Sequence, residues 1–245
     1  MFILGFMDSD IQKLKEEALQ KASYIFEQKV LPHFTSFNTA LDIGTGNGYT
    51  SFTLAKHFNE VHSIDSDLKC IKAAEDKKSK NKITNVQFSQ MDAHELKFQD
   101  EFFDVVTCRA AIHHFDNPNA VLKEVKRVLR KNGFFVIMDF CFSDKSKELL
   151  EPLSRIREDD FRRYYTFHEY CDLLDRNDLQ IDTIYTYTLP RSLDEWVSVA
   201  PKNICQRIIN AFLHLPPKIL EELDFENSSN MMIYRIIEMV SIKIK

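Results

Sequence analysis

The chain has 245 residues, a formal net charge of −5 and a hydrophobic fraction of 44%. This length is enough for one large α/β domain, and the composition is typical of a folded globular protein rather than a disordered one. The excess of acidic residues argues against binding along a nucleic-acid backbone, which requires a surplus of Lys and Arg.

Five cysteines are spread along the chain, with no CxxC pair and no cluster with histidines at metal-ligand spacing. This pattern predicts reduced thiols, a cytoplasmic location and no metal site. The apolar residues 1–7 are followed by Asp8 and Asp10. These charges come too early for a signal peptide or a membrane span, so we expect an uncleaved chain without a spanning helix.

The first part of the chain alternates helix-like and strand-like patterns. An amphipathic helix is predicted from an N-cap at Ser9 to near Pro32, and a later helix begins at Pro118 and is expected to end at a C-cap formed by Asn132 and Gly133. Strands are predicted at residues 39–43, 61–65, 86–90, 102–108 and 134–138, with helices at 49–58 and 68–80 between them. Repeated strand–helix steps of this kind indicate a parallel sheet with helices on both faces.

The remaining chain predicts helices at residues 145–157, 167–176 and 202–213, and strands at 179–188 and 231–244. We interpret these strands as the last two of the same sheet and the helices as an inserted cap. The fold class is therefore a doubly wound, seven-stranded, mostly parallel α/β sheet with inserted cap helices. We expect one domain, divided into an N-terminal helical segment (1–37), a cofactor-binding core (38–142), and a part with the cap helices and last two strands (143–245).

A glycine-rich turn follows the first core strand. Three of the five glycines, Gly44, Gly46 and Gly48, stand there, where doubly wound sheets bind nucleotides and the backbone must let a ligand come close. Asp65 follows Gly44 by 21 residues and ends the next strand, a position from which a carboxylate can accept hydrogen bonds from both ribose hydroxyls of an adenosine. Asp67 is instead expected to cap the following helix.

Two adenosine cofactors compete for this turn. A dinucleotide fingerprint reads Gly-x-Gly-x-x-Gly, with its third glycine where Tyr49 stands, whereas this chain has Gly-x-Gly-x-Gly. The preceding Asp42 would repel a pyrophosphate but suits a ligand with an ammonium and a sulfonium. The pattern therefore favours S-adenosylmethionine (SAM) over a nicotinamide dinucleotide.

Several motifs together resemble those of one family. Residues 41–48 are similar to motif I of class I SAM-dependent methyltransferases, residues 61–65 to their ribose-binding strand, and residues 91–93 to their adenine-binding turn. Residues 103–109 with 113–115 resemble the motif after their fourth strand, and residues 125–133 the helix before strand five. The arrangement is most similar to small-molecule methyltransferases named after ubiquinone and menaquinone biosynthesis.

The resemblance implies SAM as cofactor, with S-adenosylhomocysteine as product, and a set of cofactor-binding residues. These are Asp42, Gly44, Thr45, Gly46, Gly48, Asp65, Ser66, Met91, Asp92, Ala93, Cys108 and Arg109. Methyl transfer needs no enzyme nucleophile, and we assign no catalytic residue. If the acceptor must lose a proton, the candidate bases are His113, His114, Tyr164, Tyr165 and His168.

The acceptor is expected to be a small molecule, since the chain is acidic and lacks the Asn/Asp-Pro-Pro-Tyr motif used on amino groups of bases. Two alternatives stay open: a nicotinamide-dependent oxidoreductase, and a SAM-binding protein without catalysis. Residues 148–167 are predicted to shape the acceptor pocket and not the cofactor pocket. The sequence carries no signal for an oligomeric state.

Overall fold

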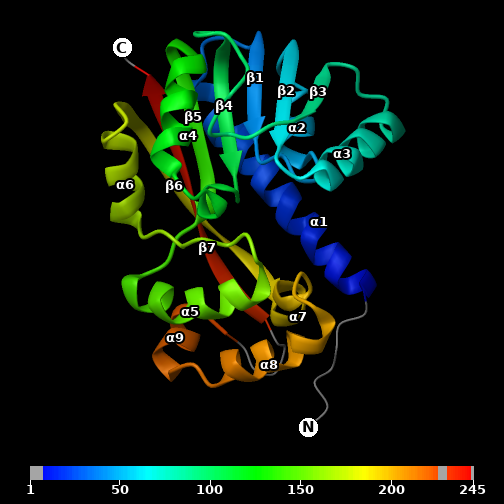
Figure 1. Cartoon of the computed structure of the whole chain (residues 1–245), viewed down its shortest axis with the longest axis vertical. Helices are drawn as coiled ribbons and strands as arrows, with labels where there is room; N and C mark the ends of the chain where they lie inside the picture. The colour runs from blue at the N-terminus through cyan, green and yellow to red at the C-terminus, as the bar shows by residue number, and fades with distance from the viewer. Residues whose placement is uncertain (1–7, 226–230, 244–245) are drawn as a thin grey trace.

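The computed structural model describes residues 8–225 and 231–243 and has a seven-stranded sheet at its centre (Figure 1). Its strands are β1 (Thr39–Ile43), β2 (Glu60–Asp65), β3 (Val86–Gln90), β4 (Phe103–Arg109), β5 (Leu129–Phe140), β6 (Leu179–Ser192) and β7 (Met231–Lys243). Their order across the sheet is β3-β2-β1-β4-β5-β7-β6, and β7 runs antiparallel to both neighbours. The predicted α/β fold with a mostly parallel sheet is confirmed.

The predicted helices are all present. They are α1 (Asp8–Ile25), α2 (Tyr49–Leu54), α3 (Leu68–Lys80), α4 (Pro118–Val128), α5 (Asp144–Arg157), α6 (Phe167–Asp175) and α8 (Lys202–Leu213). Within the described residues, two further α-helices, α7 (Leu193–Val197) and α9 (Pro217–Glu222), were not predicted because one and a half turns are too short for a periodic pattern. Within residues 8–225 and 231–243, no helix is long and apolar enough to cross a membrane.

Successive side chains of the central strands point to opposite faces of the sheet and build two cores. Ala40 of β1 and Val105 of β4 belong to a core shared with α2 and the chain after α1. Their neighbours Leu41 and Val106 belong to a core shared with α4 and α6. Burial on both faces explains why the central strands read as continuous apolar runs rather than as alternating ones.

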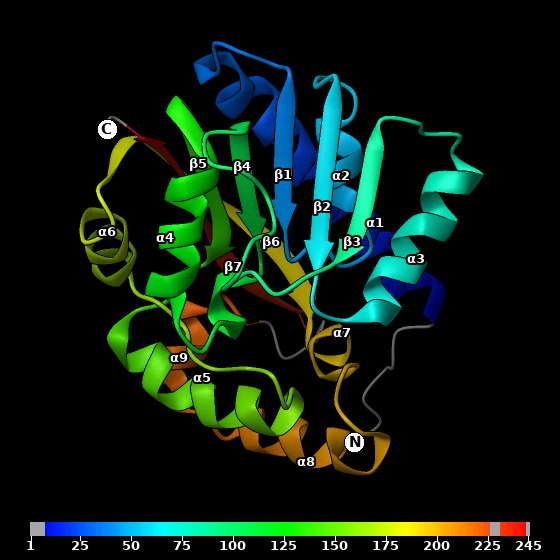
Figure 2. The same ribbon diagram turned by 45° about the horizontal axis from the view of Figure 1, so that its top comes forward.

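The helices α5, α7, α8 and α9 form a cap beyond the carboxyl ends of β1 to β5 (Figures 1 and 2). The cap has a hydrophobic core of its own around Trp196 and Phe212, whose side chains are fully buried. The Arg157 guanidinium lies 4.8 Å from the Trp196 ring centre within this core. Because Ile236 of β7 belongs to this core, the cap is packed onto the end of the sheet.

The junction between α4 and β5 differs from the prediction. The helix ends at Val128, and Leu129 already pairs with Phe103 in the sheet, so Asn132 and Gly133 are not the helix C-cap. Asn132 instead adopts a φ of 61° inside β5. An added Cβ at Gly133 would lie 3.0 Å from the Asp104 carbonyl oxygen, so this glycine permits close approach of two strands rather than helix termination.

Asp104 ties three segments together at the amino-terminal edge of the sheet. One carboxylate oxygen accepts from the backbone N–H groups of Asn38 and Thr39, both at 2.9 Å, and the other accepts from Arg130 at 2.6 Å. Burial alone would raise the pKa of Asp104. The Thr39 N–H and the Arg130 guanidinium outweigh this effect, so the pKa is lowered.

We predict that Asp104→Ala lowers the free energy of unfolding by about 2–4 kcal/mol, because it leaves buried donors without an acceptor. Asp76→Ala, on an exposed position of α3, is the control and is expected to change it by less than about 0.5 kcal/mol. Since the folded-state pKa of Asp104 is lowered, its contribution is complete above the unfolded value of about 3.9 and is lost as the pH falls through the folded value. Urea denaturation at neutral and acidic pH measures the loss of unfolding free energy and its pH dependence. An equal effect of Asp104→Ala at the two pH values would contradict a stabilising role for the ionised Asp104 carboxylate.

Candidate functional site

A cleft with a volume of about 510 Å³ lies at the carboxyl edge of the parallel strands. Its walls come from the loops after β1, β2, β3 and β4 and from the segment after α5. The lining residues are Ile43, Gly44, Gly46, Ile64, Asp65, Ser66, Asp67, Cys70, Met91, Asp92, Ala93, His94, Ala110, Ala111, His114, Phe115, Asp116, Asp160 and Arg162. Both the position and the size are typical of a nucleotide-sized ligand site.

The turn after β1 forms the floor of the cleft. The N–H groups of Gly44 and Thr45 both donate to the Ile64 carbonyl oxygen, which holds the turn against the end of β2. Gly44 has a φ of +69°, and an added Cβ there would lie 2.4 Å from Ala111 Cβ. The loops after β1 and β4 therefore meet at Gly44, and a side chain at this position would force them apart.

Asp65 joins the turn after β1 to the start of α3. One of its carboxylate oxygens accepts from the Gly46 N–H at 2.8 Å, and the other accepts from the Asp67 N–H at 2.9 Å. Asp67 in turn caps α3 by accepting from the Lys69 N–H, so the predicted capping role of Asp67 is confirmed. Each Asp65 oxygen keeps a further lone pair for a ligand in the cleft.

The loop after β3 presents Met91, Asp92 and Ala93 to the cleft. Asp92 accepts from the His94 backbone N–H at 2.9 Å and from its ring at 2.6 Å, and these contacts lower the pKa of Asp92. The His94 ring lies edge-on to Phe115, with ring centres 5.9 Å apart. This wall combines flat apolar surface with a carboxylate, as an aromatic base with an amino group would require.

Two of the predicted cofactor residues are buried below the turn instead of lining the cleft. Asp42 is 1% exposed and accepts from Ser51 at 2.7 Å and from Thr107 at 2.9 Å. Burial raises the pKa of Asp42, and the two hydroxyl donors oppose this rise. Thr45 is also buried, and its hydroxyl lies 2.6 Å from that of Ser51. Both side chains stabilise the turn and α2 from beneath.

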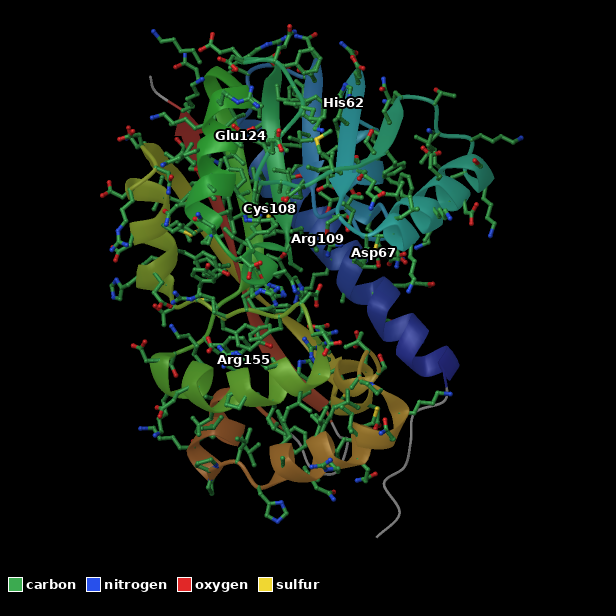
Figure 3. All side chains as sticks on the ribbon, in the orientation of Figure 1. His62, Asp67, Cys108, Arg109, Glu124 and Arg155 are labelled. Carbon is green, nitrogen blue, oxygen red and sulfur yellow. The ribbon has the colours of Figure 1, made fainter. Side chains whose placement is uncertain are left out.

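Three further predicted residues also lie outside the cleft lining. Gly48, with a φ of +80°, is the N-cap of α2, and an added Cβ would lie 2.9 Å from the Phe52 ring. Cys108 is 1% exposed in the core. Arg109 points to the other face of the sheet and donates to Thr50 at 2.8 Å. Figure 3 labels Cys108, Arg109 and Asp67 near this edge of the sheet.

Sequence reasoning missed the part of the cleft wall that comes from the segment after α5. Asp160 and Arg162 line the same cleft as Gly46 and Asp65, and the role of this segment in an acceptor pocket stays a prediction. Its position is fixed because the N–H groups of Arg162 and Arg163 both donate to the His113 carbonyl oxygen. The Arg162 side chain also pairs with Asp116 across the cleft edge. Local sequence patterns do not predict such a contact between segments that lie far apart in the chain.

His114, Glu158 and Asp160 bring three possible metal ligands within 4.8 Å of one another. Each is already engaged inside the protein, however. Glu158 pairs with Arg157 at 2.5 Å, and His114 Nδ1 lies 3.5 Å from an Asp160 carboxylate oxygen. We therefore read this cluster as ion pairs that fix the segment after α5, and we assign no metal to it.

The contrast between Gly44 and Gly46 gives a stability prediction. Gly44→Ala is expected to lower the free energy of unfolding by about 2–4 kcal/mol, since it adds a clash with Ala111 to the strain of a left-handed residue. At Gly46 an added Cβ meets no atom within 4 Å, so Gly46→Ala carries the strain alone, about 1–2 kcal/mol. Urea denaturation compares the two; equal losses would show that the approach of the two loops is unimportant.

A second prediction concerns Arg162. Arg162→Ala is expected to speed release of S-adenosylhomocysteine about two- to fivefold, because one exposed ion pair across the cleft edge is worth up to about 1 kcal/mol. Arg163→Ala is the matched control, since Arg163 pairs with Glu169 away from the cleft. Stopped-flow displacement measures both rates, and an effect of Arg163→Ala as large as that of Arg162→Ala would refute this role.

Comparisons with known proteins agree with this geometry. A family model described as "Methyltransferase domain" matches residues 34–171, more than half of the chain. The uncharacterized methyltransferase YcgJ of Bacillus subtilis is 30% identical over 159 residues, which cover 64% of this chain and 63% of that protein. The UbiE C-methyltransferase of ubiquinone/menaquinone biosynthesis from Vibrio parahaemolyticus is 30% identical over 132 residues, 52% of this chain and 47% of that protein. The aligned regions thus span less than two thirds of these relatives.

Solved structures share the fold over nearly the whole chain. The YcgJ crystal structure has a TM-score of 0.81 at 24% identity and covers 94% of this chain and 99% of that one. Geranyl diphosphate C-methyltransferase from Streptomyces coelicolor has a TM-score of 0.64 at 13% identity, with 97% and 86% covered. With more than half of its length matched by the family model, the chain belongs to the methyltransferase domain family.

Proposed function

We propose that the enzyme binds SAM in the cleft and transfers its methyl group to a small-molecule acceptor held under the cap. One observation carries this proposal: the glycine turn at Gly44, the carboxylate of Asp65 and the turn at Asp92 line one cleft at the carboxyl edge of the sheet. The sequence motifs that suggested each part lie far apart along the chain. Their convergence on one cavity supports a common ligand.

The residues present suit SAM. The space beside Gly46 is open, because an added Cβ would meet no atom within 4 Å, so the backbone there can face a ligand. Five carboxylates line the cleft, namely Asp65, Asp67, Asp92, Asp116 and Asp160, against the single guanidinium of Arg162. This balance favours a ligand that carries positive charge and opposes a pyrophosphate, which argues against the nicotinamide alternative.

Of the twelve predicted cofactor residues, we keep seven as proposed contacts. These are Gly44, Gly46, Asp65, Ser66, Met91, Asp92 and Ala93, all of which line the cleft. Asp65 would accept from the ribose, while Met91 and Ala93 would flank the adenine with Asp92 at its amino group. Asp42 and Thr45 would act indirectly, by holding the turn in shape from below.

SAM supplies a methyl group bound to a positively charged sulfur, which an electron-rich acceptor atom can displace. The protein contributes the relative position of the two reactants and the exclusion of water from them. The cleft would fix one reactant, and the cap beyond the carboxyl ends of the strands (Figure 1) would cover the other, so that the two meet in a site that excludes water. No covalent bond to the protein is required.

A small acceptor agrees with the names of the relatives. Among them are C-methyltransferases of ubiquinone/menaquinone biosynthesis and of geranyl diphosphate, whose names point to small-molecule acceptors. The acidic net charge of −5 disfavours a nucleic-acid acceptor. All five cysteines are free thiols in the structure, which fits the proposed cytoplasmic location. A non-catalytic SAM-binding role would share the cleft but would give no turnover with any acceptor.

The test of the cofactor site is Asp65→Ala. Loss of hydrogen bonds to a charged acceptor, about 1.5–3 kcal/mol, is expected to weaken SAM and S-adenosylhomocysteine binding together, by about 10- to 100-fold. Calorimetric titration of the wild type, Asp65→Ala and the exposed control Asp76→Ala measures the change. Unchanged affinity in a folded Asp65→Ala protein would remove this residue from the site.

A further inference from the structure

A buried histidine–carboxylate pair links the loop after β4 to the end of β5. His113 lies in the short 3-10 helix Ile112–His114 and Asp139 in β5, and they are 3% and 1% exposed. His113 Nδ1 lies 2.8 Å and 3.0 Å from the two oxygens of the Asp139 carboxylate. The Phe140 backbone N–H also donates to Asp139, at 2.7 Å. The pair is thus held in one geometry.

This geometry determines which ring nitrogen of His113 is free. Nδ1 faces a carboxylate that has only acceptor oxygens when ionised, so Nδ1 carries a hydrogen and donates it. Nε2 of the neutral ring then carries a lone pair. Among residues 8–225 and 231–243, the hydrogen-bond partner of the His113 ring is Asp139, through Nδ1. A histidine with Nδ1 held by a carboxylate and Nε2 free is arranged to accept a proton, and the carboxylate stabilises the resulting cation.

His113 also stands between the cofactor cleft and the cap. Its chain neighbours Ala111 and His114 line the cleft. Its ring centre lies 4.2 Å from that of His114, 5.5 Å from that of Phe140 and 6.1 Å from those of Phe161 and Tyr164. Phe161 and Tyr164 belong to the core of the cap. The imidazole therefore lies between the residues that line the cleft and the aromatic residues of the cap core.

The other candidate bases are less suited to this role. Burial, with the neighbouring His113, lowers the pKa of His114, and its Nδ1 faces Asp160. The Tyr164 hydroxyl lies 2.7 Å from that of Ser154 inside the cap core, and burial raises its pKa. Burial also raises the pKa of Tyr165, to about 12. His168 is exposed on α6. Of these candidates, His113 is the one whose ring nitrogen is oriented by a buried carboxylate.

We propose that His113 is the general base of the reaction, that Asp139 is its positioning residue, and that the acceptor carries a phenolic or enolic hydroxyl. This inference rests on the proposed methyltransferase function and specifies its substrate class. The hydroxyl proton moves to Nε2. The electron pair it leaves, on oxygen or on the conjugated carbon, forms the new bond to the methyl carbon. The carbon–sulfur bond breaks with its pair on sulfur, which leaves neutral S-adenosylhomocysteine, and His113 then returns the proton to solvent.

A purely structural role for the pair gives different expectations. A buried ion pair that only ties the loop after β4 to β5 would matter for stability but not for the protonation of Nε2. It would also leave turnover insensitive to any substitution of His113 that preserves the fold. The two roles are therefore separated by the tautomer of the ring and by kcat.

The first experiment needs no acceptor. The wild type is labelled with 15N-histidine, saturated with S-adenosylhomocysteine and studied by NMR at pH 8, with His113 assigned by its absence in His113→Gln. We expect the form with hydrogen on Nδ1 and a lone pair on Nε2, and a mixture of tautomers in Asp139→Asn. A hydrogen on Nε2 in the wild type at this pH would overturn the proposal.

The second experiment measures turnover with catechol and 1,3-dihydroxynaphthalene as phenolic probes and benzylamine as a probe without a hydroxyl. We expect S-adenosylhomocysteine to form with a phenol and not with benzylamine. His113→Gln is expected to lower kcat about 100-fold or more with an unchanged KM for SAM. The exposed control His214→Gln should keep the wild-type kcat.

Turnover of benzylamine but not of the phenols, or a His113→Gln kcat within about threefold of the wild type, would overturn the proposal. Calorimetry with SAM separates this failure from that of the proposed function. If the wild type does not bind SAM, the cofactor site itself is wrong. If the wild type binds SAM normally and His113→Gln keeps the wild-type kcat, the general-base assignment alone is wrong.

Discussion

The hydrogen bond from the Gly46 N–H to the Asp65 carboxylate, 2.8 Å long, is the contact on which the proposed site depends. It joins the turn after β1 to the end of β2 and sets the shape of the cleft floor. Parallel pairing makes this contact possible, since Ile43 and Ile64 lie side by side in register and both strands end at the same edge. The same rule brings the loop after β4 against Gly44. The pairing of the parallel strands therefore determines which loops meet at the site.

The cap and the cofactor cleft are not independent parts. The segment after α5 leaves the cap core through Phe161 and Tyr164, yet its Arg162 side chain lines the cleft and pairs with Asp116. Two backbone donors of this segment meet the carbonyl oxygen of His113, whose ring faces the cap. Contacts on either side of His113 thus connect the place of the methyl donor with the proposed place of the acceptor. This arrangement gives a physical reason for acceptor and cofactor to influence each other's binding.

Much of the fold could be predicted because its signals are local. Central strands buried on both faces appear as apolar runs, and the glycine turn and Asp65 are recognisable from residue type and spacing. The end of α4 was missed because the pairing of Leu129 with Phe103 overrides the capping signal of Asn132 and Gly133. The short helices α7 and α9 were missed because six residues or fewer show no period.

The site was predicted only in part, for a similar reason. Asp42, Cys108 and Arg109 stand next to cleft residues in the sequence, but strand alternation directs their side chains into the core or to the other face. Asp160 and Arg162 are far away in the sequence and reach the cleft through tertiary contacts with His113. The pairing of His113 with Asp139 likewise depends on how a loop packs on a strand 26 residues later. Proximity along the chain is thus a poor guide to which side chains share a cavity.

A crystal structure of the protein with S-adenosylhomocysteine tests the central claim most directly. The account predicts the ribose hydroxyls within hydrogen-bonding distance of the Asp65 carboxylate, the adenine against Met91 and Ala93, and the sulfur on the side of the cleft that faces His113. Density for the ligand in any other place, or with its ribose turned away from Asp65, would contradict it.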